Sequence, residues 1–235
     1  MVYKIKYDKE FDKIHPSSIH EYTYKLIKPF LFKSCKLLNI GCWVGNFQVL
    51  LKNKDIKSCA VDIDEEIIRV AQNNFPNMEF KVGDTLKLPY PDNYFDIVTL
   101  WAVLEHISVN TEKEALKEIK RVLKPNGLLF FSVPNGSLSS IVFDGLQVIF
   151  AGHRHYSVEK IDELLKDSRF KIEKYYKKGG FYEAIYWLGA IVIKRTFKKP
   201  IFETKFGFWI NKKVEEEFNK NGYVELFIQA RLDEK

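Results

Sequence analysis

Two glycines and a series of acidic side chains occupy positions at which alternating strands and helices build a nucleotide site. Gly41 and Gly45 follow a short apolar run, Leu37–Ile40. A glycine there lets the backbone turn sharply and approach a ligand closely. Asp62 ends the next apolar run, 21 residues after Gly41. A carboxylate at about this spacing can accept two hydrogen bonds from a ribose diol. The spacing therefore predicts a site for a cofactor that contains a nucleoside.

Five short apolar runs predict the buried parallel strands that position these residues. The predicted strands are Leu37–Ile40, Cys59–Asp64, Phe80–Asp84, Phe95–Leu100 and Leu128–Val133. Helices are predicted between or after them, over Asn46–Lys52, Glu65–Asn74, Thr111–Leu123 and Ser157–Leu165. Asp64 has the position of an N-cap for the second of these helices. A sixth strand is predicted over Phe170–Tyr176.

These blocks, in this order, resemble the class I S-adenosylmethionine-dependent methyltransferases, specifically the broad group related to ubiquinone-biosynthesis methyltransferases. The resemblance covers about Lys36 to Lys174. It implies an α/β, Rossmann-like, doubly wound fold with a seven-stranded sheet. That sheet would be mostly parallel with an antiparallel last strand, Tyr223–Ala230, and helices on both faces. It also implies S-adenosyl-L-methionine as the cofactor and methyl transfer as the reaction.

The resemblance also assigns cofactor-binding roles to individual residues. It implies that Gly41 and Gly45 cradle the methionine part and that Asp62 holds the ribose. Asp84 would hydrogen-bond the adenine amino group, and Trp101 would lie at the methionine end. The full set of predicted cofactor-binding residues is Asn39, Gly41, Cys42, Gly45, Asp62, Ile63, Asp84, Thr85 and Trp101.

Two positions depart from the family pattern, which has Asp at the position of Asn39 and a third glycine at that of Trp43. Asn39 can still hydrogen-bond the loop, and Trp43 needs an allowed backbone conformation and space for its indole. Both changes support one alternative, a non-catalytic protein that binds S-adenosylmethionine or S-adenosylhomocysteine. A second alternative is a nicotinamide-dependent oxidoreductase, although the stretch from Gly41 to Gly45 is not the G-x-G-x-x-G fingerprint.

His106 is the first candidate for a catalytic base, because it follows the fourth strand, whose end faces the reactive end of the cofactor in this fold. Methyl transfer needs a base only when the acceptor is a protonated nucleophile such as a hydroxyl. His106 can equally be a residue that orders its loop. Glu105 and His106 resemble the end of an E-x-x-E-H metal motif, but Ala102 replaces the first acid, so no metal is predicted.

His155 is the second catalytic candidate, within the cluster His153–Tyr156 that precedes a helix N-terminus. Such a cluster can bind a substrate phosphate or carboxylate. In the alternative interpretation it is a loop whose Tyr packs inward and whose Arg pairs with an acid.

The 235 residues predict one methyltransferase domain, 1–235, with a leading helix or cap over 1–35 and a substrate-side insertion over about 178–221. Three cysteines, too few for a disulfide framework, and a first segment without an apolar signal core predict a cytoplasmic protein. The net charge of +6 is moderate, so nucleic-acid binding is not indicated. The sequence does not indicate the oligomeric state.

The predicted insertion contains an apolar stretch, Phe181–Phe197, that is followed by Lys198 and Lys199. We predict a helix and then a loop that form a lid over the acceptor pocket, with a secondary contact to membrane surfaces. In the alternative interpretation the stretch is an ordinary amphipathic helix packed on the sheet. A second apolar stretch, Leu138–Ala151, adds to the expectation of an acceptor with an apolar or lipid-like part. The predicted partner is therefore a small-molecule methyl acceptor, with O-methylation preferred.

Overall fold

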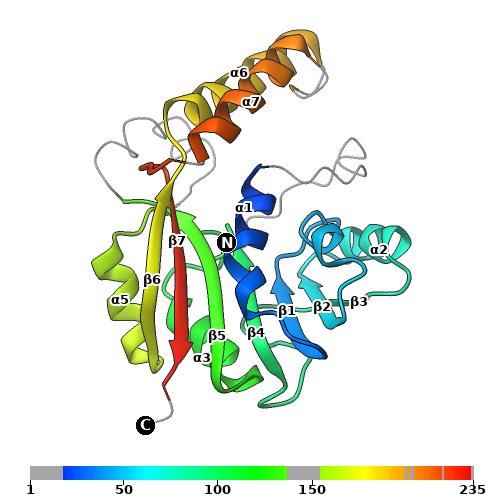
Figure 1. The fold of residues 1–235 in the computed structure, drawn as a ribbon, viewed down its shortest axis with the longest axis vertical. Coiled ribbons are helices and arrows are strands. Elements are labelled where there is room, and N and C mark those ends of the chain that lie inside the picture. Colours follow the sequence, from blue (N-terminus) through cyan, green and yellow to red (C-terminus); the bar gives the residue numbers. More distant parts are fainter. Residues whose placement is uncertain (1–17, 137–153, 199–200, 202–203, 219, 234–235) are drawn as a thin grey trace.

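A seven-stranded sheet forms the centre of the protein (Figure 1). The computed structural model describes residues 18–136, 154–198, 201, 204–218 and 220–233. The strands lie in the order β3-β2-β1-β4-β5-β7-β6, and β7 pairs antiparallel with both of its neighbours while the other pairs are parallel. The predicted Rossmann-like sheet is therefore confirmed. The strands are β1 (Cys35–Ile40), β2 (Ile56–Asp62), β3 (Glu79–Val82), β4 (Phe95–Trp101), β5 (Leu123–Pro134), β6 (Phe170–Lys178) and β7 (Glu225–Leu232).

Helices begin where the sequence supplies caps. The Asp64 carboxylate accepts hydrogen bonds from Glu66 N and Ile67 N at the start of α2, and the Ser157 hydroxyl accepts one from Lys160 N at the start of α5. Such caps stabilise a helix by about 1 kcal/mol each. The helices are α1 (Ser18–Ile27), η2 (Lys28–Phe30), η3 (Gln48–Leu51), α2 (Glu65–Asn74), α3 (Glu112–Val122), α5 (Val158–Asp167), α6 (Phe181–Phe197) and α7 (Lys205–Phe218).

Two helix predictions were wrong in extent. The segment Asn46–Lys52 contains only the short 3₁₀ helix η3, and the chain turns at Asn53, which has a left-handed φ of 65°. The leading helix, which the apolar stripe of the sequence predicts over Ser17–Phe32, ends at Ile27, because Pro29 has no N–H to continue the helix and a 3₁₀ turn follows. Residues 1–17, Leu138–Ala151, His153 and Lys199 lie outside the described residues.

The core lies on both faces of the sheet, as expected for parallel strands that alternate with helices. On one face, Leu116 and Ile119 of α3 and Leu164 of α5 pack on the central strands. On the other face, Ile27 of α1 and Phe47 pack on β1, β4 and β5. Side chains therefore cover both faces of the central strands β1 and β4.

The helices α6 and α7 form a hairpin beyond the carboxyl-end edge of the sheet (Figure 1). Helix α7 stands where a loop was predicted, and its buried residues Ile210, Val214 and Phe218 recur every four positions. That spacing was the signal that the sequence interpretation missed. Among the described helices, none combines the length and the hydropathy that crossing a bilayer requires.

Candidate active site

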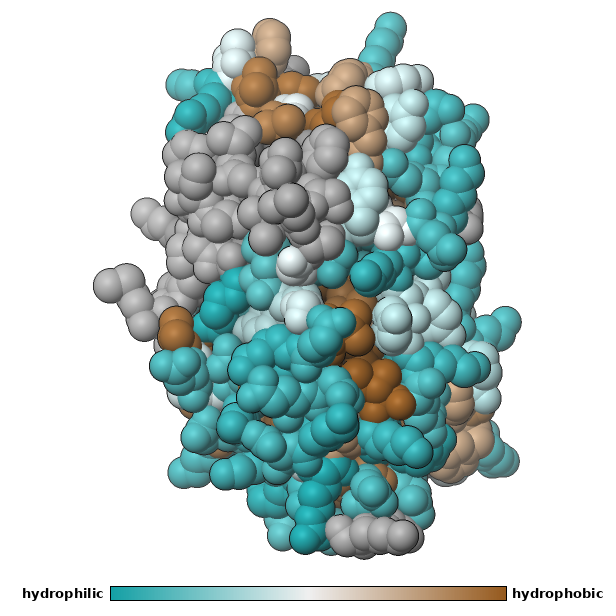
Figure 2. Space-filling model, turned by 90° about the vertical axis from the view of Figure 1, so that its left-hand side faces the viewer, coloured by the Kyte–Doolittle hydropathy of each residue, from teal (hydrophilic) through white to brown (hydrophobic). Residues whose placement is uncertain are grey.

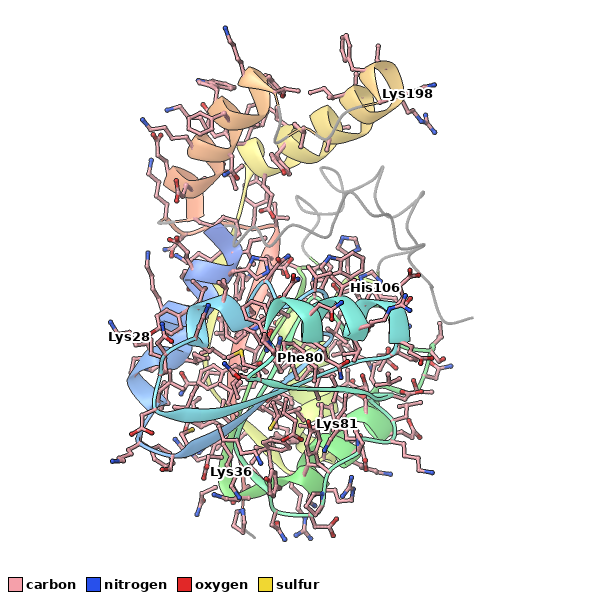
Figure 3. All side chains as sticks on the ribbon, turned by 90° about the vertical axis from the view of Figure 1, so that its right-hand side faces the viewer. Lys28, Lys36, Phe80, Lys81, His106 and Lys198 are labelled. Carbon is pink, nitrogen blue, oxygen red and sulfur yellow. The ribbon has the colours of Figure 1, made fainter. Side chains whose placement is uncertain are left out.

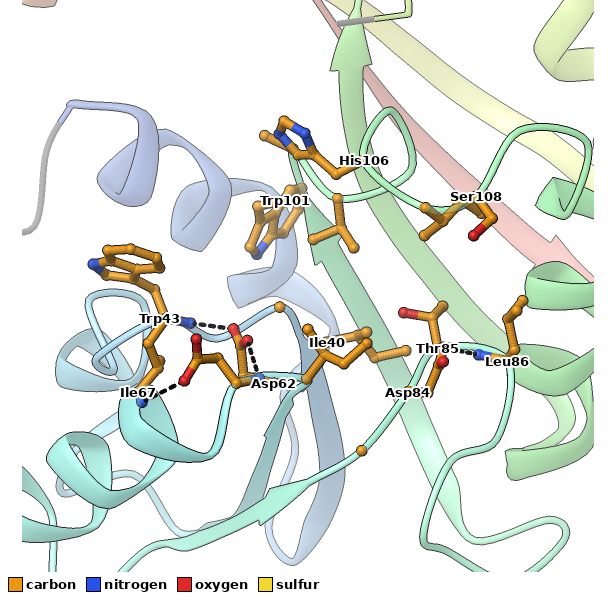
Figure 4. A pocket seen from close by; sticks show the side chains of 17 residues that line it. Ile40, Trp43, Asp62, Ile67, Asp84, Thr85, Leu86, Trp101, His106 and Ser108 are labelled. Atoms are coloured by element: carbon orange, nitrogen blue, oxygen red, sulfur yellow. Dashed lines mark hydrogen bonds between the residues drawn. The ribbon is translucent and has the colours of Figure 1, made fainter. Parts of the chain in front are cut away.

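A cavity of about 300 Å³ opens at the carboxyl ends of β1, β2 and β4, next to the loop that follows β3 (Figure 4). This volume is at the lower end of the range for small-molecule sites. The cavity brings together seven of the residues predicted from the sequence, namely Gly41, Asp62, Ile63, Asp84, Thr85, Trp101 and His106. These residues come from four separate segments of the chain, so the fold unites the predicted site.

The two glycines of the loop after β1 have different surroundings. Gly41 lies in the cavity wall with φ 69°, and a Cβ there would meet Val103 Cγ2 at 2.3 Å. Gly45 has φ 95°, and a Cβ there would meet the Phe75 ring at 2.5 Å. The absence of a side chain at Gly45 thus leaves room for the Phe75 ring. Gly45 does not appear among the described residues that line the cavity.

Trp43 adopts the left-handed conformation, with φ 49°, that a glycine would adopt most easily. Its backbone N–H donates to Asp62 Oδ2 at 3.0 Å, and its side chain lines the cavity (Figure 4). Asp62 Oδ1 accepts a second hydrogen bond, from Asp64 N at 3.2 Å. Burial raises the pKa of Asp62, while these two hydrogen bonds oppose the increase. The carboxylate is therefore fixed in orientation at the end of β2.

Asn39 and Cys42 lie beneath the loop, and their side chains are not part of the described cavity wall. Asn39 is 2% exposed. Its Nδ2 donates to Gln48 Oε1 at 3.1 Å, and its Oδ1 accepts from Thr99 Oγ1 at 2.9 Å. The Cys42 thiol donates to the Trp43 carbonyl, and burial raises its pKa well above the usual range. Both side chains support the loop from below, and their assignment to the cofactor stays a prediction.

Asp84 and Ile63 lie on exposed parts of the cavity rim. Asp84 Oδ1 accepts a hydrogen bond from Leu86 N at 2.9 Å, so its carboxylate is held by the turn that follows β3 (Figure 4). Thr85 is buried beside it. Ile63 exposes 47% of its surface although it is apolar, which suits contact with a flat aromatic ring.

Trp101 and His106 line the opposite end of the cavity. The loop between them turns through Ala102, whose φ is 52°, and His106 N donates to the Val103 carbonyl at 2.9 Å. The Trp101 ring packs edge-on against the Phe47 ring, with 5.8 Å between the ring centroids. Its Nε1 is buried and has no hydrogen-bond partner among the described residues. This end of the cavity is therefore lined by an indole ring and an imidazole.

Arg154 braces the loop that carries His106. Its guanidinium donates to the carbonyls of Leu104 at 2.7 Å and Ile107 at 2.8 Å, and it pairs with Glu112 at 3.4 Å. Tyr156 is buried and donates to the same Glu112 carboxylate at 3.0 Å. The alternative interpretation of this cluster, an inward Tyr with a paired Arg, is confirmed. The sequence interpretation missed the bracing role, because the partners are carbonyls about fifty positions earlier in the chain.

His155 belongs to the same cluster but is not among the described residues that line the cavity. Glu105, next to His106, is 4% exposed, and burial raises the pKa of its carboxyl group well above the usual range. Within the described part of the chain, no group of three or more His, Cys, Asp or Glu side chains comes together as a metal site would.

Comparison with known proteins extends these observations. Residues 38–131 match the family model described as a methyltransferase domain. The ubiquinone/menaquinone biosynthesis C-methyltransferase of Pseudomonas fluorescens is 36% identical over 98 residues. The matched region is 38% of this chain and 38% of that relative's length.

Two solved structures share the fold. A SAM-dependent methyltransferase of Methanosarcina mazei aligns with a TM-score of 0.65 and 19% identity over 90% of this chain and 99% of its own. The phosphoethanolamine N-methyltransferase 2 of Haemonchus contortus, in complex with S-adenosyl-L-methionine, aligns with a TM-score of 0.66 and 18% identity. That alignment covers 95% of this chain and 55% of the Haemonchus chain.

Proposed function

Because residues 38–131 of this chain belong to the class I S-adenosylmethionine-dependent methyltransferases related to the ubiquinone and menaquinone biosynthesis enzymes, we propose that the protein methylates a small molecule with an apolar part. The chain spans about two fifths of the length of the curated relative that it matches. The acceptor is therefore argued from the site itself.

The residues of the cavity fit the cofactor of this family. The oriented Asp62 carboxylate is placed to accept hydrogen bonds from ribose hydroxyls, and Ile63 offers an apolar surface to the adenine ring. Asp84 has a second carboxylate oxygen besides the one that Leu86 N engages. At the other end, Gly41 and the Trp101 side chain line the part of the cavity where the methionine part would lie. The observation that carries the proposal is the meeting of these groups in one cavity.

When bound, S-adenosylmethionine supplies an electrophilic methyl group and a neutral thioether as the leaving group. The protein must then align the acceptor and exclude water. His106 is the titratable side chain at the Trp101 end of the cavity, so we assign it the role of the base that removes a proton from the acceptor. The carbonyl contacts of Arg154 hold the loop on which His106 lies.

The same base is compatible with two acceptor atoms. Removal of a proton from a phenolic or enolic hydroxyl raises the electron density on its oxygen and on the conjugated carbon, so one histidine can serve O- or C-methylation. The sequence interpretation preferred oxygen. The matched relatives are named C-methyltransferases, and we therefore propose the conjugated carbon of a hydroxyl-bearing ring as the first acceptor atom and the hydroxyl oxygen as the second.

We place the apolar part of the acceptor next to Trp101, on the side of the cavity that a hydrophobic cluster borders. Trp101 packs against a hydrophobic cluster that includes Tyr22 of α1, Tyr182 and Tyr186 of α6 and Phe227 of β7. This cluster joins the leading helix and the base of the hairpin to the sheet. It supports our proposal that residues 1–235 act as one domain, with the insertion of about 178–221 on the side of the acceptor.

The test is transfer of an isotope-labelled methyl group from S-adenosylmethionine to hydroxyl-bearing rings with and without an isoprenoid tail. We expect transfer to the tailed acceptor, with the label on carbon when the product is analysed by NMR. Loss of this transfer in His106→Ala would support the base assignment. Stoichiometric cofactor binding without transfer to any acceptor would contradict the proposal and favour a non-catalytic binding protein.

A further inference from the structure

The end of the α6–α7 hairpin carries the whole net charge of the protein. We define the hairpin tip as residues 192–198 and 204–213, which are the end of α6 and the start of α7 with its preceding residue. The tip contains six of the 37 Lys and Arg residues and none of the 31 acids, so the rest of the chain has 31 of each. Figure 3 shows Lys198 at the far end of α6, well separated from His106 in the body of the protein.

The same tip exposes large apolar side chains. Phe197 is 66% exposed, Phe208 79% and Trp209 50%. Val192 and Phe206 are also exposed. Figure 2 shows apolar side chains gathered on the surface at the top of the molecule, where the hairpin lies. Soluble proteins rarely keep such a group of aromatic side chains in water unless the group binds something.

These exposed side chains are not required for the packing of the hairpin. Helix α7 turns Ile210, Val214 and Phe218 inward, and Val214 and Phe218 join the cluster with Phe227. At Gly189 of α6, a Cβ would approach Phe206 to 2.8 Å, so the two helices are in close contact there. The packing of the hairpin therefore does not explain why Phe197 and Phe208 are aromatic.

We infer that the hairpin tip is a membrane-docking element that inserts its aromatic side chains into the interface of a bilayer with anionic lipids. Interfacial elements combine Lys and Arg with Trp and Phe, and they enter the boundary between head groups and acyl chains by about 5–10 Å. The long side chains of Arg195, Lys198 and Lys205 can reach lipid phosphates while the rings insert. The inference concerns binding alone and does not depend on the methyl-transfer reaction.

The exposed rings distinguish this proposal from nucleic-acid binding. Single-stranded nucleic acid is held in a positively charged groove whose aromatic side chains stack with the bases. Here the two most exposed rings, those of Phe208 and Phe197, lie at the projecting end of a hairpin. A projecting, apolar and cationic end is suited to insertion into a lipid surface.

The first experiment is sedimentation of the full chain with vesicles, in the absence of cofactor and acceptor. We expect binding to phosphatidylcholine vesicles that contain about one third phosphatidylserine, weak binding to phosphatidylcholine alone, and weaker binding at high salt. Each cation near an anionic surface contributes about fivefold to affinity. The triple variant Arg195→Gln, Lys198→Gln and Lys205→Gln should therefore bind about 100-fold more weakly.

A second variant, Phe197→Ser with Phe208→Ser, removes the rings and keeps the charge. It should also lose vesicle binding by tenfold or more. Matched controls change exposed residues elsewhere, with Lys87→Gln, Lys117→Gln and Lys171→Gln for the charges and Phe32→Ser with Val109→Ser for the apolar groups. Both controls should bind vesicles like the unchanged protein. Circular dichroism and S-adenosylhomocysteine binding check the fold of each variant.

Lipids brominated in the acyl chain provide the direct readout of insertion. Tryptophan fluorescence should be quenched by them, and Trp209→Phe should remove most of that quenching. The proposal is overturned if the unchanged protein does not bind anionic vesicles at low salt, or if the ring variant binds as well as the unchanged protein. It is also overturned if a single-stranded RNA binds more tightly than the vesicles and displaces them.

Discussion

The backbone N–H of Trp43 donates a hydrogen bond to the Asp62 carboxylate, with 3.0 Å between the nitrogen and Oδ2. This bond links the loop after β1 to the end of β2. It also explains how a large residue occupies a position with φ 49°. The hydrogen bond and the packing around the loop hold Trp43 in a conformation that costs about 1 kcal/mol for a residue with a Cβ. The acid assigned to the ribose thus also fixes the shape of the loop.

Replacing Asp62 should therefore weaken cofactor binding. Asp62→Ala removes a charged hydrogen-bond acceptor, and we expect a loss of about 1–3 kcal/mol in the free energy of binding S-adenosylhomocysteine. Isothermal titration calorimetry measures this directly. Asp64→Asn is the matched control, because Asn also caps a helix well. Equal losses in the two variants would contradict the specific role of Asp62.

His106→Ala should lower turnover by about 10²–10⁴-fold, because the acceptor proton loses its base. Cofactor affinity should stay within about threefold, since the assigned cofactor contacts come from other residues. His155→Ala is the comparison, and we expect near-normal turnover because His155 is outside the described cavity wall. Parallel losses of turnover and cofactor affinity in His106→Ala would instead mean that His106 orders its loop.

Metal removal is expected to leave activity unchanged. Thorough chelation followed by gel filtration should not lower the rate of methyl transfer. A large loss that a divalent cation restores would assign a metal role to Glu105 and His106, which resemble the end of a metal motif.

Gly45→Ala should destabilise the folded protein by about 2 kcal/mol or more. The left-handed conformation costs about 1 kcal/mol for alanine, and the new Cβ would lie 2.5 Å from the Phe75 ring. Urea denaturation measures the change. Combining Gly45→Ala with Phe75→Leu shortens the side chain that causes the clash, so the two effects should be less than additive. Strict additivity would show that the contact does not matter.

His20 should make stability depend on pH. Burial lowers the pKa of His20 to about 4, whereas an unfolded histidine titrates near 6.5. As the pH falls below about 6.5, His20 of the unfolded state binds a proton, whereas His20 of the folded state stays neutral until about pH 4. The free energy of unfolding therefore decreases across this window. His20→Gln should lose about 1–3 kcal/mol less than the unchanged protein between pH 7 and pH 4.5. Equal pH dependence of the two proteins would contradict the burial of a neutral His20.

The sequence predicted the parts of the site that depend on strand order. Apolar runs that end in Asp62 and next to Trp101 were sufficient to place both residues at the same edge of the sheet, because the carboxyl ends of parallel strands lie together. Gly41 directly follows another such run, so it was placed at the same edge. Helix α2 was predicted with its bounds, Glu65–Asn74, and with its Asp64 cap.

Other features depend on contacts that sequence spacing does not encode. The direction of the Asn39 side chain, toward Gln48 and Thr99 and away from the cavity, follows from the packing beneath the loop. The bracing of Leu104 by Arg154 joins residues fifty positions apart. Helix α7 was missed because Phe208 and Trp209, exposed beside its buried residues, obscure its amphipathic pattern.

The central claim is that the cavity between Gly41, Asp62 and Trp101 binds S-adenosylmethionine. The most direct measurement is calorimetric titration of the unchanged protein with S-adenosylmethionine, S-adenosylhomocysteine and NAD in separate experiments. We expect the first two compounds to bind at one site per chain with affinity on the micromolar scale, about 8 kcal/mol in free energy, and NAD to give no heat of binding. Folded protein that binds NAD and neither of the other two compounds would contradict the claim.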